Sequence, residues 1–125
     1  MIVAGFGFRN IATTDSLRNA LAATRAEPPA LLAVPADKAH APAIQQLARE
    51  LGLAVLPVAE STLRAMQTQT QSQPSLDHRA TGSVAEACAL AAAGPDARLL
   101  KSRQISADRC ATCAIAQTSI QGTPT

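Results

Sequence analysis

The sequence predicts an α/β fold: a single three-layer domain with a mostly parallel or mixed sheet of about five strands flanked by helices. Short apolar runs alternate with segments of helical periodicity along most of the chain. Two more apolar runs follow each other near the C-terminal end, which adds a pair of strands joined by a turn. The 125 residues are enough for one compact domain and too few for two.

The first half of the chain contains three pairs of a strand and a helix. The predicted strands are residues 2–8, 30–34 and 53–58. The first helix has Thr14 or Asp15 as its N-cap and ends before Pro28-Pro29.

The second helix has an apolar face at helical spacing. Pro42 suits its first turn, and Gly52 follows its last apolar position. Residues 60–66 predict one or two further helical turns. Residues 67–81 are almost wholly polar and rich in Gln, Thr and Ser, so we expect a mobile loop there.

An alanine-rich helix at residues 84–93 has the clearest boundaries in the chain. Ser83 and Glu86 have the spacing of a capping box, and Gly94-Pro95 follows the last helical position. Because nearly all its side chains are small and apolar, this helix should be buried on several sides.

The C-terminal part predicts two strands, at residues 99–105 and 111–118, joined by a polar turn at residues 106–109. Residues 119–125 are expected to form a flexible tail, so the domain spans residues 1–118. This pattern does not specify the order of the strands in the sheet.

Composition excludes several classes of function. The chain has two Phe and neither Tyr nor Trp, which disfavours the base stacking used to bind single-stranded nucleic acid. A net charge of +2, with the basic residues scattered, indicates neither a duplex-binding patch nor an anionic membrane surface as partner. With no membrane-spanning run, no signal-peptide pattern and an odd count of three cysteines, the expected location is the cytoplasm.

Gly5-x-Gly7-x-Arg9 lies where the first strand is expected to meet its connecting loop, the place where open α/β sheets usually bind ligands. The pattern is not a dinucleotide fingerprint, because residue 10 is Asn. Two interpretations remain open. Either the glycines serve only a tight turn, or their N–H groups and the guanidinium of Arg9 hold an anionic group.

Gly82 and Ser83 precede the alanine-rich helix and also have two compatible interpretations. The side chains of Ser83 and Glu86 cap the helix, and the N–H groups of this turn bind a carboxylate or phosphate. Lysine is rare, since nine of the eleven basic residues are Arg. Lys38 precedes a helix and Lys101 lies in or near the fourth strand, and each is either a solvated charge or a ligand contact.

The cysteines and histidines predict no metal site, no redox centre and no cofactor. Cys110 and Cys113 have the spacing of a C-x-x-C motif. A redox dithiol lies at the start of a helix, however, and these two cysteines adjoin a predicted strand. Cys88, His40 and His78 are scattered, so a zinc site lacks its second pair of ligands. Neither histidine lies near a serine-nucleophile pattern.

An ordered set of short motifs resembles one family. The motifs are GFGFR (5–9), Asp37-Lys38, Leu51-Gly52, Glu60-Ser61-x-Leu63, Pro74-Ser75, GSVAEACAL (82–90), Leu99-x-Lys101 and ATCAIA (111–116). The set is similar to the CobE proteins and to the C-terminal domain of CbiG, both of cobalamin (vitamin B12) biosynthesis, and it extends from Gly5 to Ala116. The chain departs from the family at Cys113, where an aliphatic residue is usual.

The resemblance implies a role in making the corrin ring. CbiG-type proteins hydrolyse cobalt-precorrin-5A, opening its lactone and releasing acetaldehyde. Because the sequence does not include the N-terminal regions that accompany the domain in CbiG, the resemblance implies a stand-alone protein like CobE of the aerobic route. The implied ligand is a precorrin or corrinoid tetrapyrrole, whose carboxylate side chains require dispersed cations and N–H donors. The candidate ligand-binding residues are Gly5, Gly7, Arg9, Lys38, Gly82, Ser83 and Lys101.

Binding or handling of such an intermediate is the leading hypothesis, and two alternatives remain open. One is a hydrolase of a precorrin lactone or acyl group, with Glu86 or Lys101 as general acid or base. The other is a non-catalytic partner of another enzyme of the pathway.

Overall fold

A computed structural model describes residues 1–65, 84–94 and 96–118. The predicted loop at residues 67–81, the predicted tail at residues 119–125, and Gly82, Ser83 and Pro95 lie outside these described residues. Of the two residues of the capping box expected at the start of the alanine-rich helix, only Glu86 is therefore among the described residues.

In the described part of the chain, five strands form one mixed sheet in the order β3-β2-β1-β5-β4. The strands are β1 (Ile2–Phe8), β2 (Leu31–Pro35), β3 (Val55–Val58), β4 (Arg98–Ile105) and β5 (Ala111–Gln117). β1, β2 and β3 are parallel, whereas β5 runs antiparallel to both β1 and β4. The mixed α/β fold predicted from the sequence is confirmed.

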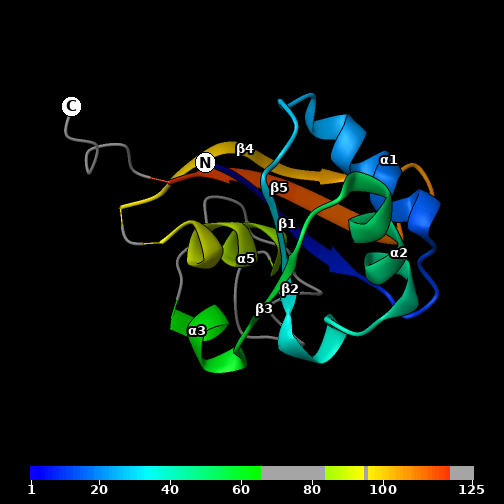
Figure 1. The fold of residues 1–125 in the computed structure, drawn as a ribbon, viewed down its shortest axis with the longest axis horizontal. Helices are drawn as coiled ribbons and strands as arrows, with labels where there is room; N and C mark the ends of the chain where they lie inside the picture. The colour runs from blue at the N-terminus through cyan, green and yellow to red at the C-terminus, as the bar shows by residue number, and fades with distance from the viewer. Residues whose placement is uncertain (66–83, 95, 119–125) are drawn as a thin grey trace.

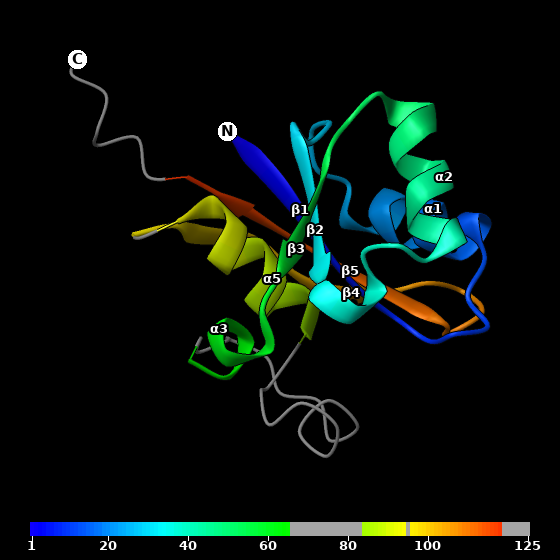
Figure 2. The same ribbon diagram turned by 60° about the horizontal axis from the view of Figure 1, so that its bottom comes forward.

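Helices cover both faces of this sheet. They are α1 (Thr14–Thr24), the short 3-10 helix η1 (Ala36–Lys38), α2 (Pro42–Leu51), α3 (Glu60–Ala65) and α5 (Val84–Ala93). In Figures 1 and 2, α1 and α2 lie on one side of the strands and α3 and α5 on the other, so the domain has three layers.

The two faces have separate apolar cores. Under α1 and α2, Phe6 and Ile115 of the sheet pack among Leu17, Ile44 and other buried residues. Under α3 and α5, small side chains dominate, because this cluster consists mostly of alanines with Val3, Val58 and Leu63. The alanine-rich helix is thus buried on several sides as predicted, and its small side chains let it approach the sheet closely.

Local signals in the sequence predicted most element ends to within two residues of their positions in the structure. Gly52 (φ 70°) ends α2 and Gly94 (φ 98°) follows α5, both with the left-handed backbone that glycine tolerates. The prediction of Thr14 or Asp15 as the first N-cap was wrong. Thr13 has that role, because its side chain and that of Ser16 each accept the other's backbone N–H.

The first strand contains a second difference. Gly5 and Gly7 lie inside β1, where both pair with residues of β5, and do not form a turn after it. The strand continues to Phe8 because the neighbouring strands on both sides supply partners for its backbone. The loop to α1 begins only at Arg9.

Candidate functional site

The carboxyl ends of the three parallel strands meet at one edge of the sheet. β1 is followed there by the loop at residues 9–13, β2 by η1, and β3 by α3. The turn between β4 and β5 lies at the same edge, because Phe8 at the end of β1 pairs with Ala111 at the start of β5. Ligands of open α/β sheets commonly bind at this edge.

Lys38 is a cation at this edge, and its side chain has two partners. Its Nζ donates a hydrogen bond to Oδ1 of Asn10 at 2.6 Å and lies 5.2 Å from the centroid of the Phe8 ring. η1 and the loop after β1 are thereby linked through side chains. The contact arises because β1 and β2 are parallel neighbours that end side by side.

Backbone hydrogen bonds hold both partners in place. The N–H of Arg9 donates to the carbonyl of Cys110 at 2.9 Å, and the N–H of Ala12 donates back to the carbonyl of Arg9 at 3.0 Å. The N–H of Ala41 donates to the carbonyl of Lys38 at 3.0 Å, just before α2 begins. The loop and η1 are therefore fixed independently of the Lys38 side chain.

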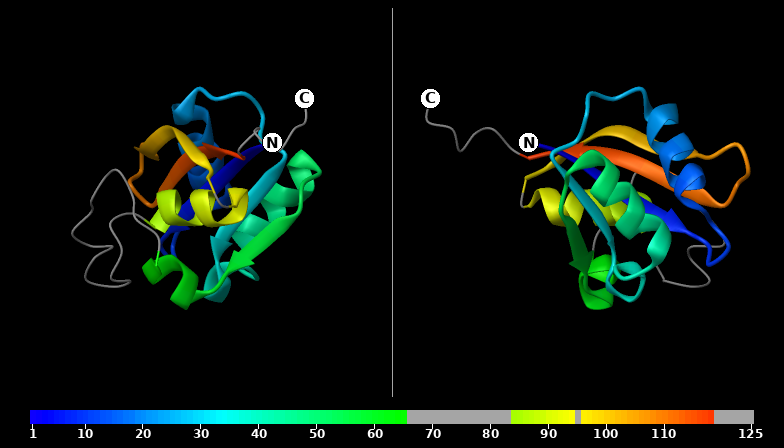
Figure 3. Two further views of the ribbon diagram at one scale, coloured as in Figure 1. Left: turned by 90° about the vertical axis from the view of Figure 1, so that its left-hand side faces the viewer. Right: turned by 45° about the vertical axis from the view of Figure 1, so that its right-hand side comes forward.

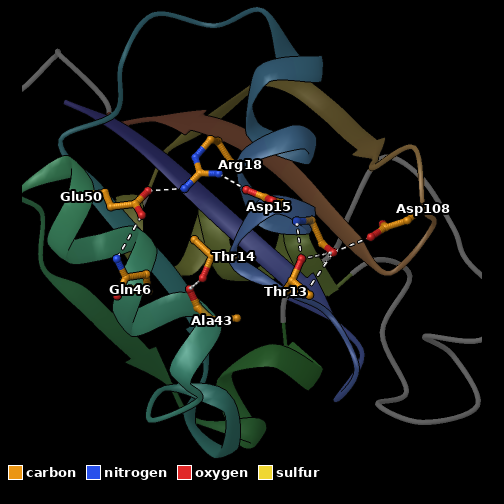
Figure 4. Close-up of polar contacts among 9 residues, drawn as sticks. Thr13, Thr14, Asp15, Arg18, Ala43, Gln46, Glu50 and Asp108 are labelled. Carbon is orange, nitrogen blue, oxygen red and sulfur yellow. Dashed lines mark hydrogen bonds and ion pairs between the residues drawn. The ribbon is translucent and has the colours of Figure 1, made fainter.

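Side chains of α1 fix the other end of this loop. Arg18 forms ion pairs with Asp15 and with Glu50 of α2, and the hydroxyl of Thr14 donates to the carbonyl of Ala43 at 3.2 Å (Figure 4). These contacts join the first turn of α1 to α2 and so to the core under both helices.

The turn between β4 and β5 is joined to α1 through Asp108. Its carboxylate accepts from the hydroxyls of Ser16 and Ser106, each at 2.5 Å, and from the N–H of Cys110 at 3.0 Å. Hydrogen bonds from Ser106, and next from Ser16, hold the pKa of Asp108 below its usual value. Figure 3 shows this turn beside α1. This cluster was not predicted from the sequence, although serine and aspartate in a short turn are a recognisable signal.

The structure brings Arg9 and Lys38 to the same edge of the sheet. Arg9 follows β1 directly, its side chain is exposed, and its guanidinium forms no ion pair with the residues that the structure describes. Asp37 and Asp108 also lie at this edge, but neither residue is without a partner. Arg9 and Lys38 are thus cations available to an incoming anion.

Gly5 and Gly7 have a clear packing function. A Cβ added to Gly5 would lie 2.2 Å from the carbonyl oxygen of Ala85 and 2.5 Å from the amide nitrogen of Ala89. A Cβ added to Gly7 would lie 3.1 Å from Thr112 Oγ1 and 3.3 Å from the side chain of Val84. These glycines therefore let α5 contact the backbone of β1.

Glu86 is completely buried in α5, and its Oε2 accepts a hydrogen bond at 3.0 Å from the backbone N–H of Arg103 in β4. The pairing of β4 with β5 is irregular between Lys101 and Gln104. Arg103 lies within this irregularity, so the Glu86 carboxylate takes the place of a strand partner for its N–H.

Lys101 does not join Arg9 and Lys38. It is exposed on β4, an edge strand, and pairs with Ile115 of β5, whose other neighbour is Ala4 in the first half of β1. Lys101 is therefore two strands away from β1 and several residues short of the carboxyl edge.

The cysteines do not form a pair. Cys110 lies in the turn and Cys113 is buried within β5, and both are free thiols. Burial raises the pKa of the Cys113 thiol far above its usual value, so this side chain behaves as a small apolar group. Among residues 1–65, 84–94 and 96–118, no cluster of three His, Cys, Asp or Glu side chains is arranged to hold a metal ion. None of the described helices is long and apolar enough to cross a membrane.

Comparison with known families explains this architecture. The sequence matches the family described as "Cobalamin synthesis G C-terminus" over residues 2–116. The chain belongs to this family. The motifs that resembled CobE and the CbiG C-terminal domain therefore indicated the correct family, and the chain is a protein of cobalamin biosynthesis. A search of curated proteins by sequence gave no match.

Solved structures of this family have the same fold. CobE, a protein from the cobalamin biosynthetic pathway, aligns with a TM-score of 0.84 at 28% identity, covering 95% of this chain and 91% of CobE. The cobalamin biosynthesis protein chiG from Agrobacterium tumefaciens aligns with a TM-score of 0.73 at 37% identity, covering 95% of this chain and 99% of chiG. A chain from Sulfolobus solfataricus shares the fold at 19% identity with a TM-score of 0.69, and the match covers 37% of that longer chain.

Proposed function

We propose that this protein binds a precorrin or corrinoid intermediate of cobalamin biosynthesis at the carboxyl edge of its sheet, through the carboxylates of the tetrapyrrole. The single observation that supports this site is the position of Arg9 and Lys38, which lie at the ends of adjacent parallel strands and are held by separate elements. Membership of the family supports the class of ligand.

Corrin precursors carry several acetate and propionate side chains around an apolar ring. Two cations held on separate elements suit two such carboxylates better than they suit one compact anion. A guanidinium binds a carboxylate through a fork of N–H donors, and an ammonium binds it as a point charge. The chain has no Trp or Tyr, so the ring would contact aliphatic side chains.

Binding is tested by titrating the purified protein with hydrogenobyrinic acid while its absorption spectrum is recorded. The parent chain should shift the spectrum with saturation. Arg9→Gln and Lys38→Met should each weaken binding by about ten-fold, the effect expected for loss of one charge-assisted hydrogen bond.

Arg49→Gln is the matched control, since it removes one positive charge near the C-terminal end of α2 and far from this edge. The affinity of this variant should equal that of the parent. The proposal fails if the pigment causes no saturable shift, or if Arg49→Gln weakens binding as much as Lys38→Met does.

A further inference from the structure

We propose that Asn10 and Phe8 hold the Lys38 ammonium in position before a ligand arrives, so that these three residues form a preformed subsite for a single carboxylate. This inference rests on the proposed function for the identity of the whole ligand. The subsite itself is inferred only from contacts within the chain. Asn10 and Phe8 are positioning residues, because they act on the ligand through Lys38.

The geometry of the Lys38 Nζ determines what it can bind. An ammonium has three N–H donors, and one of them points to Asn10 Oδ1 at 2.6 Å. The Phe8 ring centroid at 5.2 Å lies within the range in which an aromatic face attracts a cation. Both contacts orient Nζ and leave donors for a further acceptor.

Both partners of Lys38 are also uncharged. A carboxylate partner would neutralise the ammonium, as Asp15 and Glu50 do for Arg18. An amide oxygen and an aromatic face fix the side chain and leave its full positive charge. No ion pair involves Lys38 among the residues that the structure describes. The arrangement therefore keeps the cation ordered and still available to an anion.

Order before binding has an energetic consequence. A free lysine side chain loses much of its rotamer freedom when it binds a ligand, and that loss weakens affinity. Here the loop at residues 9–13 and η1 already hold Asn10 and Lys38 through backbone hydrogen bonds. Lys38 is half-buried, whereas Lys101 is exposed. The two lysines should therefore differ in how strongly they bind a carboxylate.

The chain contains only two lysines, so NMR spectroscopy can observe each one separately. In protein labelled with ¹³C-lysine, the ε-CH₂ resonance of Lys38 should be shifted upfield of that of Lys101 by the ring current of Phe8. Phe8→Leu should abolish this difference. Titration with hydrogenobyrinic acid, and separately with tricarballylate, should move the Lys38 resonance and leave that of Lys101 in place. Sodium chloride at equal ionic strength is the control.

Variants of Asn10 separate a ligand-related function from a merely structural one. Asn10→Ala releases the ammonium and should weaken binding of hydrogenobyrinic acid by about three- to ten-fold, as loss of one hydrogen bond predicts. Asn10→Asp still accepts from Lys38, but it neutralises the charge and should weaken binding further. If Asn10 only stabilised the fold, Asn10→Asp would bind like the parent. Asn10 is exposed, so both variants should fold.

The two probes distinguish failure of this inference from failure of the proposed function. If hydrogenobyrinic acid binds but the Lys38 resonance stays in place, the subsite is wrong, whereas the tetrapyrrole class of the ligand stands. If hydrogenobyrinic acid does not bind but tricarballylate moves the Lys38 resonance, the subsite stands and the tetrapyrrole assignment fails. If neither probe moves that resonance, or if Asn10→Asp binds like the parent, the inference is overturned.

Discussion

Gly5 controls how closely α5 packs against the sheet. A methyl group at this position would lie 2.2 Å from the carbonyl oxygen of Ala85, an atom of the helix backbone that cannot rotate away. Gly5→Ala must therefore displace α5 as a whole. We expect a loss of about 3 kcal/mol in the free energy of unfolding, at the upper end of the range for overpacked cores. Urea denaturation measures this loss.

Gly7→Ala is the natural control. Its added methyl group would contact Thr112 Oγ1 at 3.1 Å and the side chain of Val84 at 3.3 Å, and side chains adjust more easily than backbone. The loss should be about 1 kcal/mol. Equal stability of the two variants would contradict the packing function assigned to Gly5.

Glu86 illustrates how a residue predicted as a catalytic candidate can also be necessary for the fold. Its buried carboxylate accepts the N–H of Arg103, so Glu86→Ala leaves a partly buried donor without this acceptor and creates a cavity. This variant should lose at least about 2 kcal/mol of unfolding free energy. Glu86→Gln keeps an acceptor oxygen and should lose less. Thermal and urea unfolding of both variants test this order, and greater damage from Gln than from Ala would refute it.

The residues of the candidate site differ in how far the sequence predicted them. Arg9 and Lys38 were identifiable because each cation follows a predicted strand. Asn10 and Phe8 were not, because their contacts with Lys38 depend on β1 and β2 being parallel neighbours. Lys101 was grouped with Lys38 because lysine is rare in the chain and because Leu99-x-Lys101 is one of the motifs that resemble the family. Strand order separates the two lysines, and residue type contains no information about that order.

At the scale of elements, α1 is joined to the turn between β4 and β5 by Asp108. The pKa of Asp108 is held below the usual aspartate value. Its hydrogen bonds therefore stabilise the folded chain at pH values above the usual aspartate pKa. This stabilisation is lost as the pH falls toward the lower pKa of the folded state. Asp108→Asn should therefore be less stable than the parent near neutral pH. The difference between the two should shrink as the pH falls below the usual aspartate pKa, which urea unfolding at a series of pH values would measure.

Glu27→Gln is the control for this prediction. Glu27 is exposed, takes no part in the Asp108 cluster, and lies beyond the C-terminal end of α1. The difference in stability between Glu27→Gln and the parent should not change in the same acid range. A constant difference between Asp108→Asn and the parent at every pH would exclude the assigned linkage.

The ends of elements were predictable where a local interaction sets them. Gly52 ends α2 because glycine adopts a left-handed backbone at little cost, and Pro42 begins that helix because its missing N–H costs nothing there. Two features were missed, namely η1 and the N-cap at Thr13. A turn of three residues has no periodicity to detect, and three adjacent candidates, Thr13, Thr14 and Asp15, could each have capped α1.

At the scale of the whole molecule, the order β3-β2-β1-β5-β4 was not predictable from the sequence. The apolar pattern identified the strands, but it could not show that β5 inserts between β1 and β4. Among the strands that the structure describes, this order leaves β3 and β4 at the edges of the sheet, and both carry features that disfavour pairing with another chain. β3 is short and contains Pro57, whereas β4 has irregular pairing and presents exposed Arg98 and Lys101.

The edge at β4 gives a prediction for self-association. Leu100 and Ile105 of this strand are 38% and 41% exposed. The charged side chains beside them therefore keep β4 from presenting an apolar edge to another chain. Lys101→Val should cause concentration-dependent association, detected by sedimentation velocity. Lys101→Glu keeps a charge at the same position and should sediment like the parent. If both variants sediment like the parent, the charge of Lys101 does not protect this edge.

The same variant also tests the exclusion of Lys101 from the candidate site. If Lys101→Glu weakens binding of hydrogenobyrinic acid as much as Lys38→Met does, Lys101 contacts the ligand despite its distance from the carboxyl edge.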